Sequence, residues 1–181
     1  MKLSLHNKLI NQLRKVLVLL ILISAYYASG QDLLMTNGTF QSCDGYFFDD
    51  GGGNSYTATN YTMTICPDTP GQVVQLDFVA FVLQTSPGNG NNDTFTVYDG
   101  DNTGPGVINL GTYTGNSLQG LNITGTVDNI TGCLTVVFQD NGPDNPAAGG
   151  APGWQALISC TTPCANPVAA SAIIDPEPIS T

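Results

Sequence analysis

The stretch VVQLDFVAFVLQTSPGNGNNDTFTVYDG, residues 73–100, decides the fold of this chain. Apolar and polar side chains alternate from residue 74 to 78, which is the pattern of a strand with one buried face. The phase slips by one residue at positions 79–80 and then resumes, which predicts a bulge or bend. A loop rich in Ser, Pro, Gly and Asn follows, and residues 93–100 alternate again before an Asp-Gly turn signal. The stretch therefore predicts a pair of strands joined by a polar loop.

The chain up to residue 160 continues in the same way. Short strands are predicted near residues 45–50, 61–66, 107–113, 121–127, 133–139 and 154–160, and an apolar patch within 31–42 would suit an edge strand. Turns rich in Gly and Asn separate these segments, and none of them has helical periodicity. We expect an all-β fold, a two-sheet antiparallel β-sandwich, in which the apolar residues of 134–138 face those of 154–158.

Four sequence blocks, in this order, resemble the CUB domain, an extracellular β-sandwich of the jelly-roll type. They are VQLDFVAFVLQ (74–84), DTFTVYDG (93–100), LGTYTGN (110–116), and GCLTVVFQD (132–140) followed by GWQALI (153–158). The block YTMTICPDTPG (61–71) and the acidic composition are more similar to bacterial-type CUB-like modules than to animal ones. The resemblance implies a binding module that recognises an extracellular protein or a glycan.

Residues 1–30 have the order of a secretory signal peptide. Four basic residues come first, an apolar run fills 16–23, and small residues stand at 28–30. The apolar run is too short to span a membrane comfortably, so cleavage near Gln31 is expected rather than a transmembrane anchor. The sequence thus predicts a signal peptide at 1–30, a CUB-like domain at 31–160, and a Thr/Pro/Ala-rich linker or tail at 161–181. The linker would lead to a possible downstream module, or it is the disordered tail of a small complete protein.

Loss of the first thirty residues would change the charge of the chain. All four Lys and Arg residues and the single His lie in that segment, whereas all fourteen acidic residues, thirteen of them Asp, lie after it. Such a surface repels nucleic acids and anionic membranes, because both are bound through Lys and Arg. Clustered carboxylates in the mature chain must be stabilised by water, by backbone N–H groups or by a metal ion.

The same composition argues against catalysis. Without His, Lys or Arg there is no imidazole base, no Schiff-base lysine and no cationic clamp for a transition state. We expect a secreted or cell-surface, non-enzymatic binding module at the N-terminus of a larger exported protein. The alternatives are an accessory domain of a secreted protease or glycosidase, a structural surface or adhesin module, and a free-standing glycan-binding protein.

Five cysteines in an exported chain indicate disulfide bonds. If the strands at 45–50 and 61–66 are antiparallel neighbours, the start of one meets the end of the other. This arrangement predicts a Cys43–Cys66 bridge. Cys133 opens the next-to-last strand and Cys160 closes the last, so the two should lie at a common end of the sandwich, which predicts Cys133–Cys160. Cys164 is then left over, and the second disulfide of many CUB domains is absent, since Asn91-Asn92 and Thr114 stand at its positions.

The resemblance also implies a calcium site. In calcium-binding CUB domains the ligands end the first central strand, open the DxVxVYDG strand and follow a later strand, and a tyrosine supports them. These positions correspond to Gln84, Asp93, Asp140 and Tyr56 of this chain. Gln84 stands where the family has Glu, so the loss of one charge predicts weak Ca²⁺ binding. The alternative is that Asp93 and Asp140 cap turns.

Five Asn-x-Thr sequons are a further candidate feature. They begin at Asn37, Asn60, Asn92, Asn122 and Asn129. They would carry glycans in a eukaryotic secretory pathway. A chain rich in Asn and Thr also forms sequons by chance, so glycosylation is the weaker interpretation.

Overall fold

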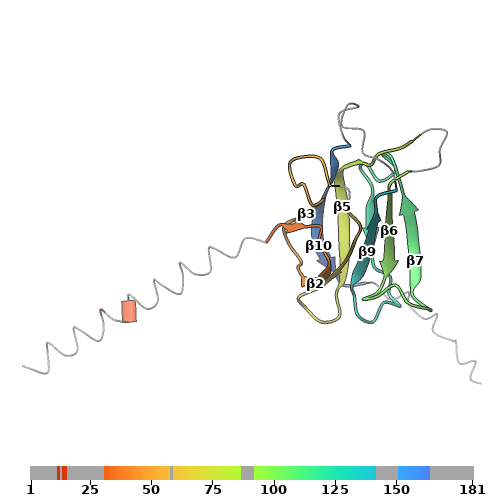
Figure 1. The fold of residues 1–181 in the computed structure, drawn as a ribbon. Coiled ribbons are helices and arrows are strands. Elements are labelled where there is room, and N and C mark those ends of the chain that lie inside the picture. Colours follow the sequence, from red (N-terminus) through yellow and green to blue (C-terminus); the bar gives the residue numbers. More distant parts are fainter. Residues whose placement is uncertain are drawn as a thin grey trace, which may run out of the picture.

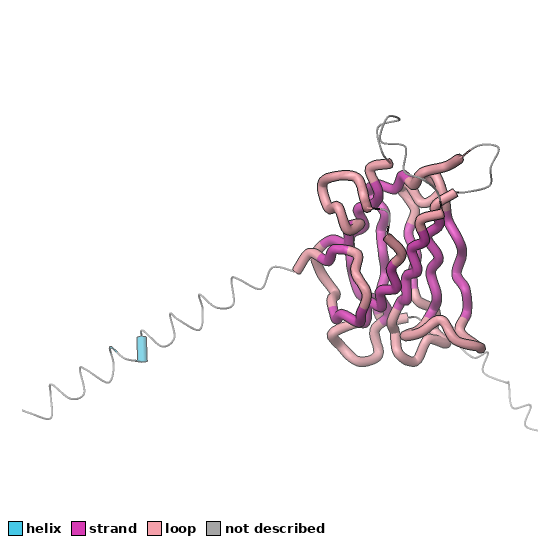
Figure 2. The backbone as a smooth tube through the Cα atoms, in the orientation of Figure 1, coloured by secondary structure: helices cyan, strands magenta, loops and turns pink. Residues whose placement is uncertain are grey.

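The computed structural model describes residues 12, 14–15, 31–57, 59–86, 92–141 and 151–163. Within these ranges the chain forms two facing sheets of strands (Figures 1 and 2). The predicted signal peptide, apart from residues 12, 14 and 15, and the tail from Cys164 onward lie outside the described residues. None of the helical residues described belongs to a helix that is long and apolar enough to cross a membrane.

Each sheet has five strands. The first has the order β1-β3-β10-β5-β8, and its strands are β1 (Leu33–Leu34), β3 (Tyr46–Phe48), β10 (Gly153–Thr161), β5 (Val73–Val82) and β8 (Asn122–Thr124). The second has the order β2-β4-β9-β6-β7, with β2 (Gly38–Gln41), β4 (Tyr61–Cys66), β9 (Leu134–Gln139), β6 (Thr94–Asp99) and β7 (Ile108–Tyr113).

This architecture confirms the predicted β-sandwich. The segment 31–42, from which one edge strand was expected, supplies two, because β1 adds to one sheet and β2 to the other. Both add in parallel, β1 beside β3 and β2 beside β4, so each sheet is mixed at one edge and antiparallel elsewhere. Strand β8 is shorter than the segment 121–127 predicted from its sequence.

The phase slip in β5 is a β-bulge. Phe78 pairs with Ala156 and Ala80 pairs with Gln155, so Val79 has no partner in the register and lies half exposed. The extra residue returns Phe81 to the core, where it is fully buried. The slip in the sequence therefore marked the position of the bulge.

Aromatic rings fill the space between the sheets. The Trp154 ring of β10 lies 4.9 Å from Phe95 of β6 and 5.2 Å from Phe138 of β9, measured between ring centroids. These contacts join the two sheets, and such ring pairs contribute about 0.5–1.5 kcal/mol beyond the area that they bury. They confirm that the apolar faces of β9 and β10 meet across the core.

The two predicted disulfide pairings are wrong, although the same four cysteines form both bridges. The bonds are Cys43–Cys160 and Cys66–Cys133, with Cα–Cα distances of 5.0 and 4.0 Å. The prediction of Cys43–Cys66 placed β3 beside β4, but these strands lie in different sheets. The prediction of Cys133–Cys160 required only a common end of the sandwich, and that end also holds Cys43 and Cys66. In the fold β3 lies beside β10 and β4 beside β9, both antiparallel. The start of one strand does meet the end of its neighbour, with a different neighbour in each case.

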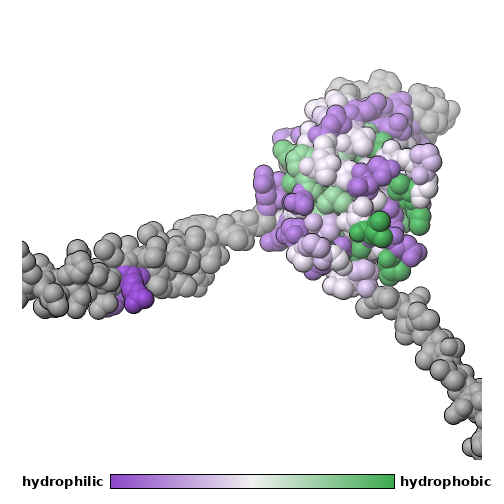
Figure 3. Space-filling view, turned by 90° about the horizontal axis from the view of Figure 1, so that it is seen from below, coloured by the Kyte–Doolittle hydropathy of each residue, from purple (hydrophilic) through white to green (hydrophobic). Residues whose placement is uncertain are grey.

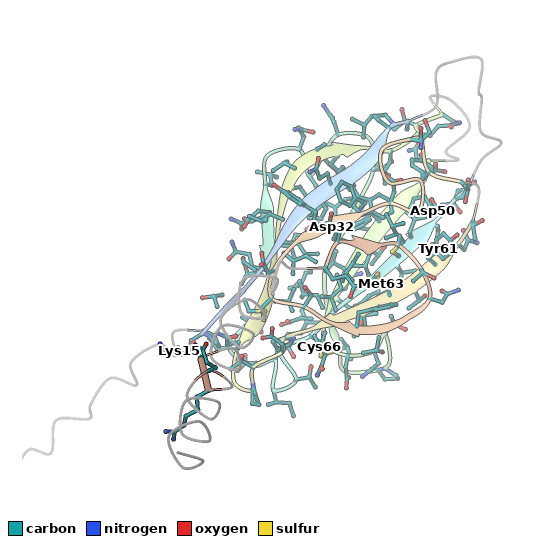
Figure 4. The ribbon with its side chains drawn as sticks, turned by 90° about the vertical axis from the view of Figure 1, so that its left-hand side faces the viewer. Lys15, Asp32, Asp50, Tyr61, Met63 and Cys66 are labelled. Carbon is teal, nitrogen blue, oxygen red and sulfur yellow. A yellow bond between two sulfur atoms is a disulfide. The ribbon has the colours of Figure 1, made fainter. Side chains whose placement is uncertain are left out.

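Both bridges lie at the same end of the sandwich, which we call the disulfide end. Strand β10 reaches Cys160 where it pairs with Val74, and the Val74 N–H donates to the Gly132 carbonyl beside Cys133, 2.9 Å away. Figure 4 shows Cys66 near this end and Asp50 and Tyr61 towards the opposite end, which we call the loop end.

Candidate functional site

Three segments meet at the loop end. Gln84 follows β5, Asp93 precedes β6, and Asp140 follows β9. Strands β6 and β9 are antiparallel neighbours with Thr94 opposite Gln139, so the backbone brings Asp93 next to Asp140. The Asp93 N–H also donates to the Gln84 carbonyl, 3.1 Å away. The described loop end therefore gathers these three residues, which are far apart in the sequence.

Asp93 lies at the centre of this cluster. Its carboxylate is buried, with 1% of the residue exposed. The Tyr56 hydroxyl donates to Oδ2 at 2.6 Å, and the Asn141 N–H donates to Oδ1 at 3.0 Å. The same Tyr56 oxygen accepts the Gln84 N–H at 2.8 Å. Tyr56, which the resemblance proposed as a supporting residue, thus contacts both Asp93 and Gln84.

Asp140 is held through its backbone. Its N–H donates to the Asn60 side-chain oxygen at 2.8 Å, and the next residue, Asn141, donates its side-chain N–H to the Asn92 carbonyl at 3.0 Å. Sequence reasoning did not include Asn60, Asn92 or Asn141 in the site. Their signal was weak, because Asn is common in every turn of this chain.

The donor chemistry of this cluster fits a weak calcium site. Calcium prefers oxygen ligands from carboxylates, amides and carbonyls. Both Asp93 oxygens accept one hydrogen bond, which leaves a lone pair on each for a metal ion. Within the described residues no group of three or more Asp, Glu, Cys or His side chains is close enough to hold an ion. Any bound Ca²⁺ would therefore depend on two carboxylates and several neutral oxygens.

A second buried carboxylate, Asp49, lies at the end of β3 and was not predicted. The Trp154 N–H donates to its Oδ2 at 3.0 Å and the Gly51 N–H to its Oδ1 at 2.8 Å. Burial is the main reason why the pKa of Asp49 is raised to about 6, and the neighbouring Asp50 adds to the effect. A Cβ atom on Gly153 would lie 1.9 Å from Asp49 Oδ2, so only glycine fits there. Through the hydrogen bond from Trp154, Asp49 links the end of β3 to the start of β10.

Asp99 is a third buried carboxylate, at the disulfide end. It closes β6 and is 8% exposed. Thr126 donates to it through its N–H at 3.1 Å and through its hydroxyl at 2.5 Å, and the Asn129 side chain donates at 2.7 Å. Neutral donors therefore satisfy this carboxylate.

Comparisons with known proteins bear on the fold. No protein-family model matches the chain, and no curated protein matches it either. Among solved structures, the full extracellular region of zebrafish Gpr126/Adgrg6 aligns with a TM-score of 0.51 at 20% identity over 71% of this chain. The CUB1-EGF-CUB2 domains of human MASP-1/3 align with a TM-score of 0.51 at 18% identity over 70%, and those of rat MASP-1 with 0.50 at 19% over 69%.

The chain spans only part of these structures, namely 15% of the first, 43% of the second and 42% of the third. Sequence identities this low support a similar fold, and the activities of the larger proteins are not inferred from them. The order of the strands, the two facing sheets and these alignments agree with one another. The chain is a CUB-like β-sandwich.

Proposed function

We propose that this chain is a non-enzymatic, secreted or cell-surface binding module whose loop end is stabilised by Ca²⁺. The CUB-like fold supports the proposal, since one similar structure is the extracellular region of a larger protein. Two disulfide bonds are consistent with an oxidising compartment. The lack of His, Lys and Arg after residue 30 supports binding over catalysis, because the usual general bases and cationic clamps are missing.

One observation carries the calcium part of the proposal. The buried Asp93 carboxylate lies beside Asp140 in a domain that has no basic side chain to neutralise either group. Two carboxylates about 5 Å apart repel each other by roughly 3 kcal/mol at an effective dielectric constant near 20. A bound cation would replace this repulsion by attraction. It would also join the segment before β6 to the segment after β9.

The ligands would be the carboxylates of Asp93 and Asp140 and the side-chain oxygen of Gln84, with loop carbonyls and water completing the set. Tyr56 would support Asp93 beside the ion, since its hydroxyl donates to Oδ2. The neutral Gln84 makes the site weak, with a dissociation constant on the order of 10⁻⁴–10⁻³ M, as in other extracellular modules. Millimolar calcium would still fill such a site.

Thermal unfolding with and without calcium tests the proposal. Calcium in tenfold excess over its dissociation constant should stabilise the chain by about 1.4 kcal/mol, which raises Tm by a few degrees relative to excess EDTA. Asp93→Ala should abolish this shift, and Gln84→Glu should enlarge it. Asp101→Ala is the matched control, because Asp101 is an exposed aspartate that lies two residues beyond β6, towards the disulfide end.

Isothermal titration with CaCl₂ provides the direct measurement. It separates loss of the site from loss of the fold, because each variant is first checked for a cooperative melt. Identical wild-type melts in calcium and EDTA, together with a flat titration, would mean that Asp93 and Asp140 only shape turns. The calcium part of the proposal would then be abandoned.

A further inference from the structure

A second surface of the molecule, at the disulfide end, has an unusual composition. Three large apolar residues there are exposed: Ile108 at 51%, Val127 at 53% and Ile130 at 98%. All three are close to Asp99 in the fold. Ile108 is its register partner in β7, while Val127 and Ile130 directly follow the two residues that donate hydrogen bonds to its carboxylate. Figure 3 looks onto this end and shows apolar side chains gathered there among polar ones.

The loop that carries Val127 and Ile130 is held firmly in place. Besides the bonds to Asp99, the Asn129 side chain donates to the Cys133 carbonyl at 2.7 Å and accepts the Gly132 N–H at 2.9 Å. The disulfide bond from Cys133, the residue after Gly132, to Cys66 joins this loop to the end of β4. Although these bonds fix the conformation of the loop, the Ile130 side chain is almost fully exposed to solvent. Burial of an isoleucine side chain stabilises a protein, and folding of this domain does not bury Ile130.

The Asn129 sequon at this position is unsuited to a glycan. Both hydrogens of the Asn129 amide are engaged, one by Asp99 Oδ1 and one by the Cys133 carbonyl, each at 2.7 Å. Attachment of a sugar would replace one of these hydrogens and open the loop. The apolar side chains at the disulfide end therefore remain accessible in the folded chain.

We propose that Ile130 and Val127 form the centre of a docking surface for a protein segment that is both apolar and basic. A rigid aliphatic side chain that projects from an ordered loop has the properties of an interface hot spot, because little conformational freedom is lost on binding. Asp128, an exposed aspartate, directly follows Val127, and a second exposed aspartate, Asp101, lies two residues after Asp99 at the same end. With no Lys or Arg after residue 30 the chain cannot offer complementary charge to a second copy of itself, so the partner supplies it.

The acidic groups of the chain also argue against a membrane as the binding partner of this surface. A bilayer surface with anionic lipid repels a domain that carries only acidic groups. A protein segment that combines apolar side chains with Lys or Arg complements both the exposed aliphatic side chains and the aspartates of this surface. This inference rests on the proposed binding role, but it concerns the end of the sandwich away from the candidate calcium site.

Selection of peptides from a random phage library tests the proposal. The purified chain is the bait, in calcium-containing buffer, with counter-selection against Ile130→Ser. Recovered peptides should combine Lys or Arg with aromatic or aliphatic residues. Synthetic copies should bind the wild type, lose about tenfold or more in affinity to Ile130→Ser, and lose less to Val127→Ser. Affinity should also fall as NaCl is raised from about 50 to about 500 mM.

Leu121→Ser is the matched control, because Leu121 is 56% exposed and lies before β8, outside the loop that carries Val127 and Ile130. It should leave peptide affinity unchanged, and Ile130→Ser should melt like the wild type. Peptides without basic residues, or peptides that bind Ile130→Ser equally well, would overturn the proposal. So would Ile130-dependent sedimentation with phosphatidylcholine vesicles, which would assign the surface to lipid. Failure of the peptide selection leaves the calcium melts unaffected, so the two proposals can fail separately.

Discussion

The two ends of this sandwich stabilise their buried carboxylates by different means. At the disulfide end, neutral donors from one loop surround Asp99, and two covalent bridges fix the strands nearby. At the loop end, Asp93 has a tyrosine hydroxyl and one backbone N–H, and a second aspartate lies beside it. Neither described disulfide lies at the loop end. We therefore expect the stability of the disulfide end to depend on its two bridges and the loop end to respond to calcium and pH.

The largest predicted effect breaks the covalent support of the disulfide end. Replacing both Cys66 and Cys133 by Ala should lower the free energy of unfolding by about 2–5 kcal/mol, because the bridge constrains a long loop of the unfolded chain. Urea unfolding of the double variant and the wild type measures the difference. The calcium-dependent rise in Tm should persist in the variant, since the ion is proposed to bind at the other end. Loss of that rise would show that the two ends are coupled.

Peptide mapping under non-reducing conditions checks the premise of this comparison. It should recover Cys43 linked to Cys160 and Cys66 linked to Cys133. A peptide that links Cys43 to Cys66 would contradict both bridges, because each cysteine forms one disulfide bond.

This pairing marks how far the sequence could predict the structure. Alternation and turn signals are local properties, so they located most strands and the β5 bulge. Tyr56, Gln84 and Asp93, which meet at the loop end, were proposed from the resemblance to CUB domains instead. The neighbour of a strand is not a local property. Cys43 lies between β2, which is beside β4, and β3, which is beside β10, so Cys66 and Cys160 are both near it. Nothing in the segment 43–50 distinguishes the two pairings.

Burial of single aspartates was beyond prediction for the same reason. Asp49 stands just before an Asp-Gly pair and Asp99 within one, and both positions are typical of solvated turns. Their burial comes from distant partners, since Trp154 donates to Asp49 and Thr126 donates to Asp99. An aspartate that closes a strand and one that caps an exposed turn are alike in sequence. Only a neighbouring strand, as for Asp49, or a distant loop, as for Asp99, separates them.

The second predicted effect concerns pH at the loop end. The pKa of Asp49 rises from 3.8 to about 6 on folding, so the folded chain holds this proton more tightly than the unfolded chain. The resulting stability is fully present below about pH 4 and is lost as pH rises through 6, at about 1.4 kcal/mol per pKa unit. The free energy of unfolding should therefore fall by up to about 3 kcal/mol between pH 4 and 7 on account of this group.

The Asp49→Asn variant isolates this contribution. Asn cannot ionise, so the variant should lose stability less steeply than the wild type over the same pH range. The slopes are compared rather than the absolute stabilities, because Asn can accept only one of the two N–H bonds from Gly51 and Trp154. Parallel slopes for the two proteins would mean that Asp49 titrates alike in the folded and unfolded states.

The smallest predicted effect tests whether the Tyr56 hydroxyl and a bound cation can each stabilise the Asp93 carboxylate. Tyr56→Phe keeps the ring against Phe138, where the centroids lie 5.1 Å apart, and removes the bonds to Asp93 and from the Gln84 N–H. In EDTA the loss should be about 1–2 kcal/mol, the usual effect of leaving buried polar groups without a partner. In calcium the loss should be smaller, because the ion would stabilise the Asp93 charge directly.

Tyr61→Phe is the matched control for this last comparison. The Tyr61 hydroxyl donates to Asp50 at 3.1 Å, a carboxylate that is partly exposed and lies outside the proposed set of ligands. Its removal should lower stability by about 0.5 kcal/mol, equally in calcium and EDTA. If Tyr56→Phe behaves in the same way, the phenol and the ion do not share Asp93. The loop end would then be held by hydrogen bonds alone, as Asp99 is held at the disulfide end.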